Sequence, residues 1–430
     1  MFKKAIEGQI HMNMLVIGNG FDLAHGLPTK YTDFLEFIKV IKQALSKDKL
    51  SGIDWGNTDI KVQNLLKSNK GKVQENLFSN RQMWKDLINN NIWIKYFQQC
   101  NMNKKENWID FESEISEVIQ SVDKDMHNHD IDDVIENISN DFLMDYHTRR
   151  DTKYIVAAQT IQEDLPEGIT YKEIRNRLLD DLNRLIRALE IYLCEYIEKI
   201  EIKKKSPDID ALDIDHVLSF NYTHTFLKLY RIVQGDEKNF SNLFDYIHGE
   251  VSSSRLLEHN NMVLGIDEYL PDERRDKEID FIAFKKFYQR IYKGTGCKYK
   301  EWIDKIQGDY LEYVHKQVEV DGREKNFIPD KMQAMMNRLS AQAMKSQKCR
   351  RHNLYIFGHS LDVTDRDILR DLILNDNVYT TIFYHSKEAM GQQIANLVKV
   401  IGQDELIKRT GGNTKTIEFK LQQDMVLIND

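Results

Sequence analysis

Short, wholly apolar runs alternate along this chain of 430 residues with longer runs that have helical spacing. Residues 14–17 are apolar without interruption and end at a glycine, which is typical of a strand buried on both faces of a parallel sheet. After a turn, large apolar side chains recur at the spacing of one helical face and predict a helix over 31–44. These side chains are Phe34, Phe37, Ile38 and Ile41.

The same two patterns return farther along the chain. Further strands are predicted at 216–220, 244–247, 262–265, 354–357, 378–384 and, as an edge strand, 416–421. Helical spacing dominates 50–210, most clearly over 174–200, and predicts later helices at 365–374 and 387–401. Strands separated by helices predict an α/β fold, here a doubly wound, mostly parallel, Rossmann-like sheet.

The positions of these elements predict how the chain is divided. We expect a nucleotide-binding core made of residues 13–50, 211–270 and 352–430. Residues 51–210 and 271–351, where helical spacing dominates, are expected to form two helical insertions.

Composition narrows the function classes. The net charge is −8 and the pI is near 6.0, whereas a general nucleic-acid binder is usually basic. An exception is 331–351, which carries six Lys or Arg and no acid. The four cysteines are far apart in sequence, which fits a reducing cytoplasm and favours neither a metal site nor a short disulfide loop. No apolar run approaches the roughly 18 residues of a membrane span, so no membrane association is expected.

Four motifs follow predicted strands. They are Gly18-Asn19-Gly20-Phe21-Asp22, Ser219-Phe220-Asn221-Tyr222, His248-Gly249 and Gly358-His359-Ser360-Leu361. In an open α/β sheet, ligands bind beyond the carboxyl ends of the strands. The motifs would therefore bring glycine-lined backbone, a polar amide and a titratable base to one site.

Each motif also has a structural interpretation. Gly18 and Gly20 permit a tight turn, after which backbone N–H groups at a helix start can face a phosphate. Leu23 stands where the dinucleotide fingerprint needs its third glycine, so an ordinary dehydrogenase is not predicted. Asp22 either binds ribose hydroxyls or caps the following helical turn. Asn221 alone would be a turn residue, and His248 alone would be a histidine that ends a buried strand.

The order and spacing of the motifs resemble those of sirtuins. Gly18-x-Gly20 is followed by Gly26-Leu27-Pro28 at the distance found in the sirtuin opening. The later sirtuin motifs, an Asn-containing tetrad, a His-Gly pair and a Gly-x-Ser-Leu segment, are matched in order. Their counterparts here are Asn221, His248-Gly249 and the residues Gly358, Ser360 and Leu361.

A closer resemblance is to the AbiH-like family of bacteriophage abortive-infection proteins. It covers nearly the whole chain and includes residues 16–23, the tetrad 219–222, His248-Gly249 and the segment 358–365. It also includes Trp108-x-Asp110-x-Glu112. The resemblance implies a role in halting infected cells.

Departures from sirtuins narrow the implied chemistry. Asn19 and Asp22 replace an Ala and a Ser of the first sirtuin loop, and Phe220 and Thr223 stand where deacetylases use Gln and Asp. The zinc-ribbon cysteines are absent, so protein deacetylation is not implied. Sirtuin-like defence proteins cleave NAD with the same Asn and His positions. The resemblance therefore implies that this chain hydrolyses NAD to ADP-ribose and nicotinamide.

The residue types suit that reaction. Breaking the nicotinamide–ribose bond develops positive charge on the ribose and needs orientation and a base. Asn221 both donates and accepts hydrogen bonds, and His248 titrates near neutrality, so these two are the predicted catalytic residues. Further candidates are Asp110, which otherwise caps a helix, together with Glu112 and Tyr222. The predicted nucleotide-binding residues are Gly18, Asn19, Gly20, Phe21, Asp22, Gly358, Ser360 and Leu361.

Other functions stay open at this point. The same site could bind a nucleotide without hydrolysis and act as a sensor. A toxin directed at nucleic acid through the basic stretch 331–351 is a second alternative, disfavoured by the overall acidity. No metal is predicted, because 127–130 resembles a metal-binding clip only superficially. An unrestrained NAD hydrolase would poison its host, so control by homo-oligomerisation or by a phage-derived trigger is expected.

Overall fold

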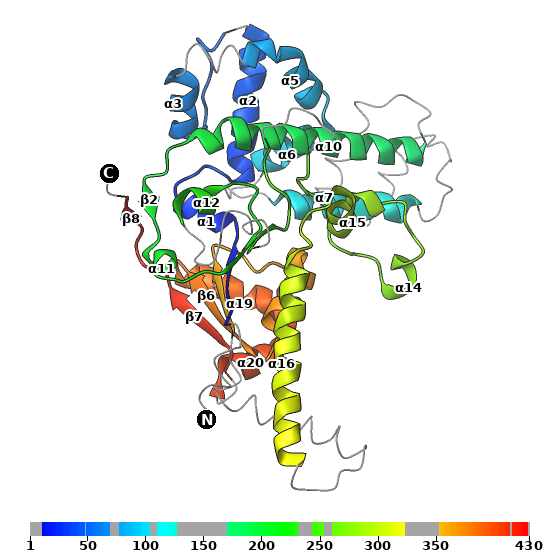
Figure 1. Ribbon diagram of the computed structural model, residues 1–430. Helices are drawn as coiled ribbons and strands as arrows, with labels where there is room; N and C mark the ends of the chain where they lie inside the picture. The colour runs from blue at the N-terminus through cyan, green and yellow to red at the C-terminus, as the bar shows by residue number, and fades with distance from the viewer. Residues whose placement is uncertain are drawn as a thin grey trace.

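A six-stranded parallel sheet lies at the centre of the protein (Figure 1). The computed structural model describes residues 11–47, 49–68, 77–103, 110–126, 170–230, 243–252, 260–322, 352–412 and 415–428. The strands, in spatial order, are β4 (Phe244–Tyr246), β3 (His216–Ser219), β1 (Asn13–Ile17), β5 (His352–Phe357), β6 (Val378–Tyr384) and β7 (Ile417–Leu421). The α/β class and the parallel sheet predicted from the sequence are therefore confirmed, with β7 as the expected edge strand.

The strand order reverses beside the central strand β1. From β1 the chain builds outward to β3 and β4, and it then returns to the other side of β1 to build β5, β6 and β7. Because all six strands are parallel, their carboxyl ends meet at one edge of the sheet. The reversal places the loops that follow β1 and β5 next to each other at this edge.

One predicted strand is wrong. Residues 262–265 form no strand, and Val263 instead donates its N–H to the carbonyl of His248 at 2.7 Å. The next residue with a strand-like contact, Ile266, forms an isolated bridge with Lys285. The apolar run is buried because it packs against helices, and this burial gives it the composition of a core strand.

Helices cover both faces of the sheet. Alternate residues of β1 point to opposite faces, so that Val16 belongs to one core and Ile17 to the other. The Val16 face packs against α16 (Tyr299–Gly322), α18 (Arg366–Ile373), α19 (Lys387–Ile401) and α20 (Gln403–Thr410). The Ile17 face packs against α1 (Asn19–Ala24), α11 (Pro207–Asp210) and α12 (Thr225–Leu229).

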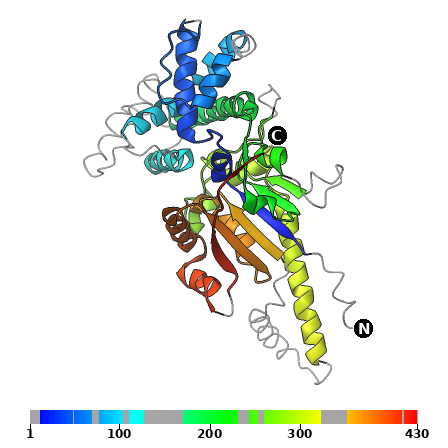
Figure 2. The same ribbon diagram turned by 90° about the vertical axis from the view of Figure 1, so that its left-hand side faces the viewer.

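A group of helices lies beyond the carboxyl edge of the sheet (Figures 1 and 2). It comprises α2 (Tyr31–Lys47), α3 (Ile60–Ser68), α5 (Arg81–Ile88), α6 (Ile92–Asn103), α7 (Phe111–Met126) and α10 (Tyr171–Glu195). Large aromatic side chains fill its core, including Phe34, Phe37, Trp84, Trp93, Phe97 and Tyr192. A capping box between Thr170 and Glu173 starts α10, which is the helix predicted over 174–200.

The remaining elements of the described ranges are short, apart from the helix α15. They are η2 (Ile197–Lys199), α14 (Asp272–Arg275), η4 (Ile282–Phe284), α15 (Lys286–Lys293), η6 (Val363–Asp365) and a two-stranded pair of β2 (Lys204–Lys205) with β8 (Val426–Leu427). The helices predicted at 31–44, 365–374 and 387–401 are confirmed as α2, α18 and α19. None of the helices in the described ranges combines the length and apolar character that crossing a bilayer requires.

Candidate functional site

The loops after β1 and β5 pack against each other, and glycine makes this contact possible. A Cβ atom on Gly20 would lie 2.8 Å from both Cα and the carbonyl oxygen of Gly358. Gly358 has φ +67°, and a Cβ there would lie 2.1 Å from the nitrogen of Phe21. Gly18 is equally crowded, with its position for Cβ 2.8 Å from Gly358 O. The glycines predicted to surround a phosphate therefore hold two loops of the protein together.

Two N–H groups of the first loop bond within the protein. Gly20 donates to the carbonyl of Gly358 at 2.8 Å, and Phe21 donates to the carbonyl of Gly18 at 2.8 Å. The Asn19 side chain accepts a hydrogen bond from the hydroxyl of Thr29 at 2.6 Å. A nucleotide at this edge would therefore have to be bound by side chains more than by the N–H groups of Gly20 and Phe21.

The other loop residues predicted to bind a nucleotide lie in different environments. Phe21 is fully buried and packs edge-on against Phe357 at 5.9 Å between ring centroids. Leu361 is buried with φ +59°, the left-handed region that a branched residue rarely adopts. Ser360 is exposed, and its carbonyl accepts a hydrogen bond from Asn396 at 2.9 Å.

Asp22 and Asn221 form a buried pair beyond β1 and β3, termed here the amide–carboxylate pair. Asp22 is 1% exposed and Asn221 is 5% exposed. Asp22 Oδ2 accepts a hydrogen bond from the hydroxyl of Thr223 at 2.6 Å. Asp22 Oδ1 and both amide atoms of Asn221 are buried without a hydrogen-bond partner among the described residues. Such atoms are rare in folded proteins because leaving one unsatisfied is costly, so they are candidate contacts for a ligand or a water molecule.

The Asp22 carboxyl titrates near physiological pH. Burial raises its pKa to about 6, although hydrogen bonds from Thr223 and Thr225 and the nearby Asn221 amide lower it. No ion pair of Asp22 occurs in the part of the chain that the structure describes. Above pH 6 this side chain is therefore a buried negative charge without a cationic partner.

Local structure fixes the backbone of Asn221 beyond the end of β3. The hydroxyl of Ser219 accepts from the N–H of Asn221 at 3.1 Å and donates to its carbonyl at 3.0 Å. The residues on either side, Phe220 and Tyr222, face His248, with ring centroids 5.5 and 6.3 Å away. The predicted catalytic residues Asn221 and His248 thus lie at the same edge, with Asn221 paired to Asp22.

His248 contacts a carboxylate that the sequence did not single out as a site residue. Its Nε2 lies 3.2 Å from Oδ1 of Asp365, and both side chains are buried. His359 approaches the other oxygen, with Nε2 3.6 Å from Asp365 Oδ2. The N–H of Leu361 donates to His359 Nδ1 at 2.9 Å, which leaves the proton of a neutral His359 ring on Nε2. Asp365 therefore lies between two imidazoles.

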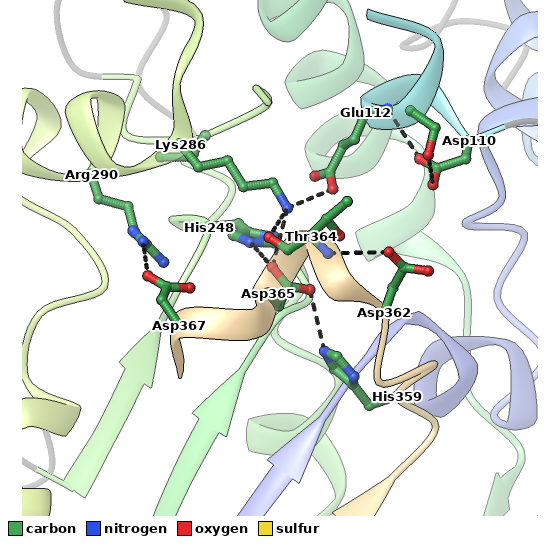
Figure 3. Close-up of polar contacts among 12 residues, drawn as sticks. Asp110, Glu112, His248, Lys286, Arg290, His359, Asp362, Thr364, Asp365 and Asp367 are labelled. Carbon is green, nitrogen blue, oxygen red and sulfur yellow. Dashed lines mark hydrogen bonds and ion pairs between the residues drawn. The ribbon is translucent and has the colours of Figure 1, made fainter. Parts of the chain in front are cut away.

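Lys286 joins this carboxylate to the helical group (Figure 3). Its Nζ lies 2.6 Å from Glu112 Oε2 on α7 and 3.1 Å from Oδ1 of Asp365, the last residue of η6. The third partner is the carbonyl of Thr364, at 3.3 Å. Lys286 is 2% exposed, and its three N–H donors each have an acceptor. Glu112, His248, Lys286 and Asp365 are called the Lys286 network below.

One ammonium among several carboxyls sets their protonation. Burial raises the pKa of Glu112 to about 8 and that of Asp267 to about 7, in both cases against the charge of Lys286. Burial also acts to raise the pKa of Asp365, but Lys286 and the two imidazoles hold it well below its usual value. Burial, followed by the charge of Lys286, lowers the pKa of His248 to about 4, although Asp365 opposes this. At neutral pH the site therefore contains ionised Asp365, charged Lys286 and a neutral imidazole.

Of the remaining candidates, Asp110 and Tyr222 make hydrogen bonds within the protein. Asp110 accepts hydrogen bonds from the N–H of Glu112 and the hydroxyl of Ser113, both at 3.0 Å, as a helix cap does. The hydroxyl of Tyr222 donates to the carbonyl of Val263 at 2.8 Å. Trp108, the segment 127–130 and the basic stretch 331–351 lie outside the described residues.

Lys286 and Asp365 were the main omissions from the sequence-based site. Lys286 lies in a helix whose polar residues Gln289 and Arg290 are also buried, whereas Phe287 is 41% exposed. Helical spacing alone predicts the opposite, with the apolar residues of such a helix buried and its polar residues exposed. Asp365 ends the motif segment 358–365, so its position was a usable signal. Among the described residues, no group of three or more His, Cys, Asp or Glu side chains is arranged to hold a metal ion.

A comparison with protein families identifies the chain. Residues 14–385 match the family described as "Bacteriophage abortive infection AbiH", a match that runs from β1 to the end of β6 and includes every site residue above. The chain belongs to the AbiH family. Membership in the AbiH family indicates a function in abortive infection by bacteriophage. No curated protein and no solved structure matches the chain.

Proposed function

We propose that this AbiH-family protein hydrolyses NAD to ADP-ribose and nicotinamide at the carboxyl edge of its sheet. The observation that carries the proposal is the amide–carboxylate pair, in which Asp22 Oδ1 and both amide atoms of Asn221 are buried and unsatisfied. Numbered along the chain, the strands of the sheet have the order 3-2-1-4-5-6, which is found in dinucleotide-binding sheets. Such sheets bind their ligand beside the strand where the order reverses, and here that strand precedes Asp22.

The chemistry follows from the charges. Water attacks C1′ of the nicotinamide riboside, the C1′–N1 bond breaks, and nicotinamide leaves as a neutral ring with the bonding electron pair. The ionised Asp22 carboxylate stabilises the positive charge that develops on the ribose, because it is buried and has no cation beside it. Asn221 orients a ribose hydroxyl or the attacking water through its free amide. His248, neutral at pH 7, accepts the proton of the water.

The test is nicotinamide release from NAD by the purified full chain. The protein is prepared from uninfected and from phage-infected cells, because the expected restraint would silence the resting form. Asn221→Ala and His248→Ala are expected to lower the rate by about 10²–10⁴-fold, the usual contribution of a positioned acid–base group. Exposed residues of the same types provide the controls, and Asn176→Ala and His385→Ala should leave the rate unchanged.

Two results separate the alternatives. No release from either preparation rejects hydrolysis. Calorimetry that then shows NAD binding lost in Asn221→Ala would establish a nucleotide sensor, which uses the same two unsatisfied side chains without turnover. Release that is unaffected by Asn221→Ala and Asp22→Asn would place the reaction elsewhere in the molecule.

A further inference from the structure

Lys286 is the one group of the Lys286 network that contacts both the helical group and the sheet edge. Glu112 belongs to α7, Lys286 begins α15, and Asp365 ends η6, so three distant segments meet at a single ammonium (Figure 3). All three residues are at least nine-tenths buried. An ammonium in this position affects every charge within a few ångströms, because little water screens it.

The geometry makes His248 dependent on this ammonium. Lys286 Nζ and His248 Nε2 lie 3.1 and 3.2 Å from the same oxygen, Asp365 Oδ1, and are therefore within about 6 Å of each other. A second positive charge on His248 would face Lys286 across one carboxylate. Asp365, ionised because of Lys286, lies 3.2 Å from Nε2 and so favours the neutral tautomer with its proton on Nε2 and its lone pair on Nδ1, although Nε2 is without a hydrogen-bond partner among the described residues.

We propose that Lys286, held by Glu112, is a positioning residue that keeps His248 neutral and its Nε2 proton directed at Asp365. Its kinetic consequence rests on the proposed NAD hydrolysis, in which His248 is the base. Its effect on the protonation of His248 does not depend on that function.

The charged groups that face His248 come from two elements. Lys286 and Arg290 of α15 both disfavour the imidazolium, and Asp365 of η6 favours it. Arg290 is paired with Asp367 at 2.7 Å, and Asp267 acts on Lys286. Glu112 keeps its proton at the pH where His248 titrates, so its role there is to accept from Lys286 without adding a charge.

The test is the titration of His248 in the full chain, followed by ¹⁵N NMR of the imidazole and assigned with His248→Gln. Lys286→Met is expected to raise the His248 pKa by one to two units, a 10- to 100-fold change in proton affinity. Lys286→Arg keeps the charge and should keep the low pKa. Glu112→Gln copies the protonated side chain and should also leave the titration unchanged. A His248 pKa that is the same in Lys286→Met and in the unsubstituted protein overturns the proposal.

A second measurement needs no substitution and covers the case in which Lys286→Met does not fold. At pH 5.5 the unsubstituted protein should show a neutral His248 ring with its proton on Nε2. An imidazolium at that pH, or a neutral ring protonated on Nδ1, overturns the proposal.

Kinetics distinguish this proposal from the proposed function. In Lys286→Met the acid limb of nicotinamide release should move to higher pH with the His248 pKa, and kcat should fall more than KM changes. An inert protein with the expected titration would reject NAD hydrolysis and leave the role of Lys286 intact. An active protein whose titration ignores Lys286 would reject the role of Lys286 and leave hydrolysis intact.

Discussion

The amide–carboxylate pair and the Lys286 network lie at the same sheet edge but differ in how their polar groups are satisfied. In the pair, one carboxylate oxygen and both amide atoms have no partner within the described residues. In the network, Lys286 has three acceptors and Asp365 faces two imidazoles and an ammonium. The ion pairs of Lys286 hold the geometry of the network, in which Nε2 of His248 is the buried atom without a hydrogen-bond partner among the described residues. The pair has no such ion pair, and its unpaired atoms are suited to accept a ligand. The comparison supports our proposals that Asp22 and Asn221 contact the ligand and that Lys286 controls protonation.

The largest effect on stability is expected from a substitution that removes the ammonium of the Lys286 network. Lys286→Met leaves the ionised Asp365 buried without its counter-ion and removes the ammonium that faces Glu112, which should lower the free energy of unfolding by about 3–5 kcal/mol. Chemical denaturation at pH 7 measures the change. Lys300→Met removes an exposed ion pair with Asp371 and should cost no more than about 1 kcal/mol. Equal effects of the two substitutions would show that the network does not hold the fold.

The next effect has the opposite sign and tests the pair. Because the folded-state pKa of Asp22 is raised from 3.8 to about 6, its contribution to stability is present below pH 3.8 and is lost as the pH rises through 6. Asp22→Asn should therefore stabilise the protein by up to about 3 kcal/mol at pH 8 and by nothing near pH 3.5. The same substitution should abolish nicotinamide release.

Denaturation at both pH values measures this effect, and the exposed Asp276→Asn provides the control. If Asp22→Asn is more stable but inactive, the Asp22 carboxylate serves ligand binding, and its buried charge lowers the stability of the folded protein. Destabilisation at pH 8 would show instead that the carboxylate is structural and would blur the distinction between the two clusters.

A smaller effect on stability is expected where the loops after β1 and β5 pack against each other. Gly20→Ala places a methyl group 2.8 Å from backbone atoms of Gly358 and should destabilise the protein by about 1–3 kcal/mol. Gly391→Ala, in α19 with open space around it, should stabilise by about 0.5–1 kcal/mol. Thermal unfolding compares the two. If Gly20→Ala left the stability unchanged, the loops after β1 and β5 would not pack against each other as described.

The smallest expected effect tests whether the reaction depends on how Ser219 holds Asn221 in place. Ser219→Ala removes the hydroxyl that bonds both backbone groups of Asn221, and the expected loss of stability is about 1 kcal/mol. Nicotinamide release should lose kcat with little change in KM, because the amide is less well oriented. Ser46→Ala removes an exposed hydroxyl contact and should change neither quantity measurably. An unchanged kcat in Ser219→Ala would mean that the orientation of Asn221 does not limit the reaction.

Much of this protein could be predicted from its sequence, because local patterns encode local structure. The apolar run before Gly18 predicted β1, and helical spacing predicted α2, α18 and α19. Parallel strands share their carboxyl edge, so the motifs with Asn221 and His248 were placed at one end of the sheet. Residues 262–265 show the limit of the pattern, since burial against helices produces the same apolar composition as burial in a sheet.

Tertiary structure alone decided how the site is charged and which groups in it are free. The sequence contains Glu112, Lys286 and Asp365 but not the approach of three segments that lie more than seventy residues apart. Spacing also favoured anion-binding N–H groups in the first loop, whereas packing directs the N–H of Gly20 to the carbonyl of Gly358. The physical reason is that pKa values and unsatisfied hydrogen bonds depend on what surrounds a group in three dimensions.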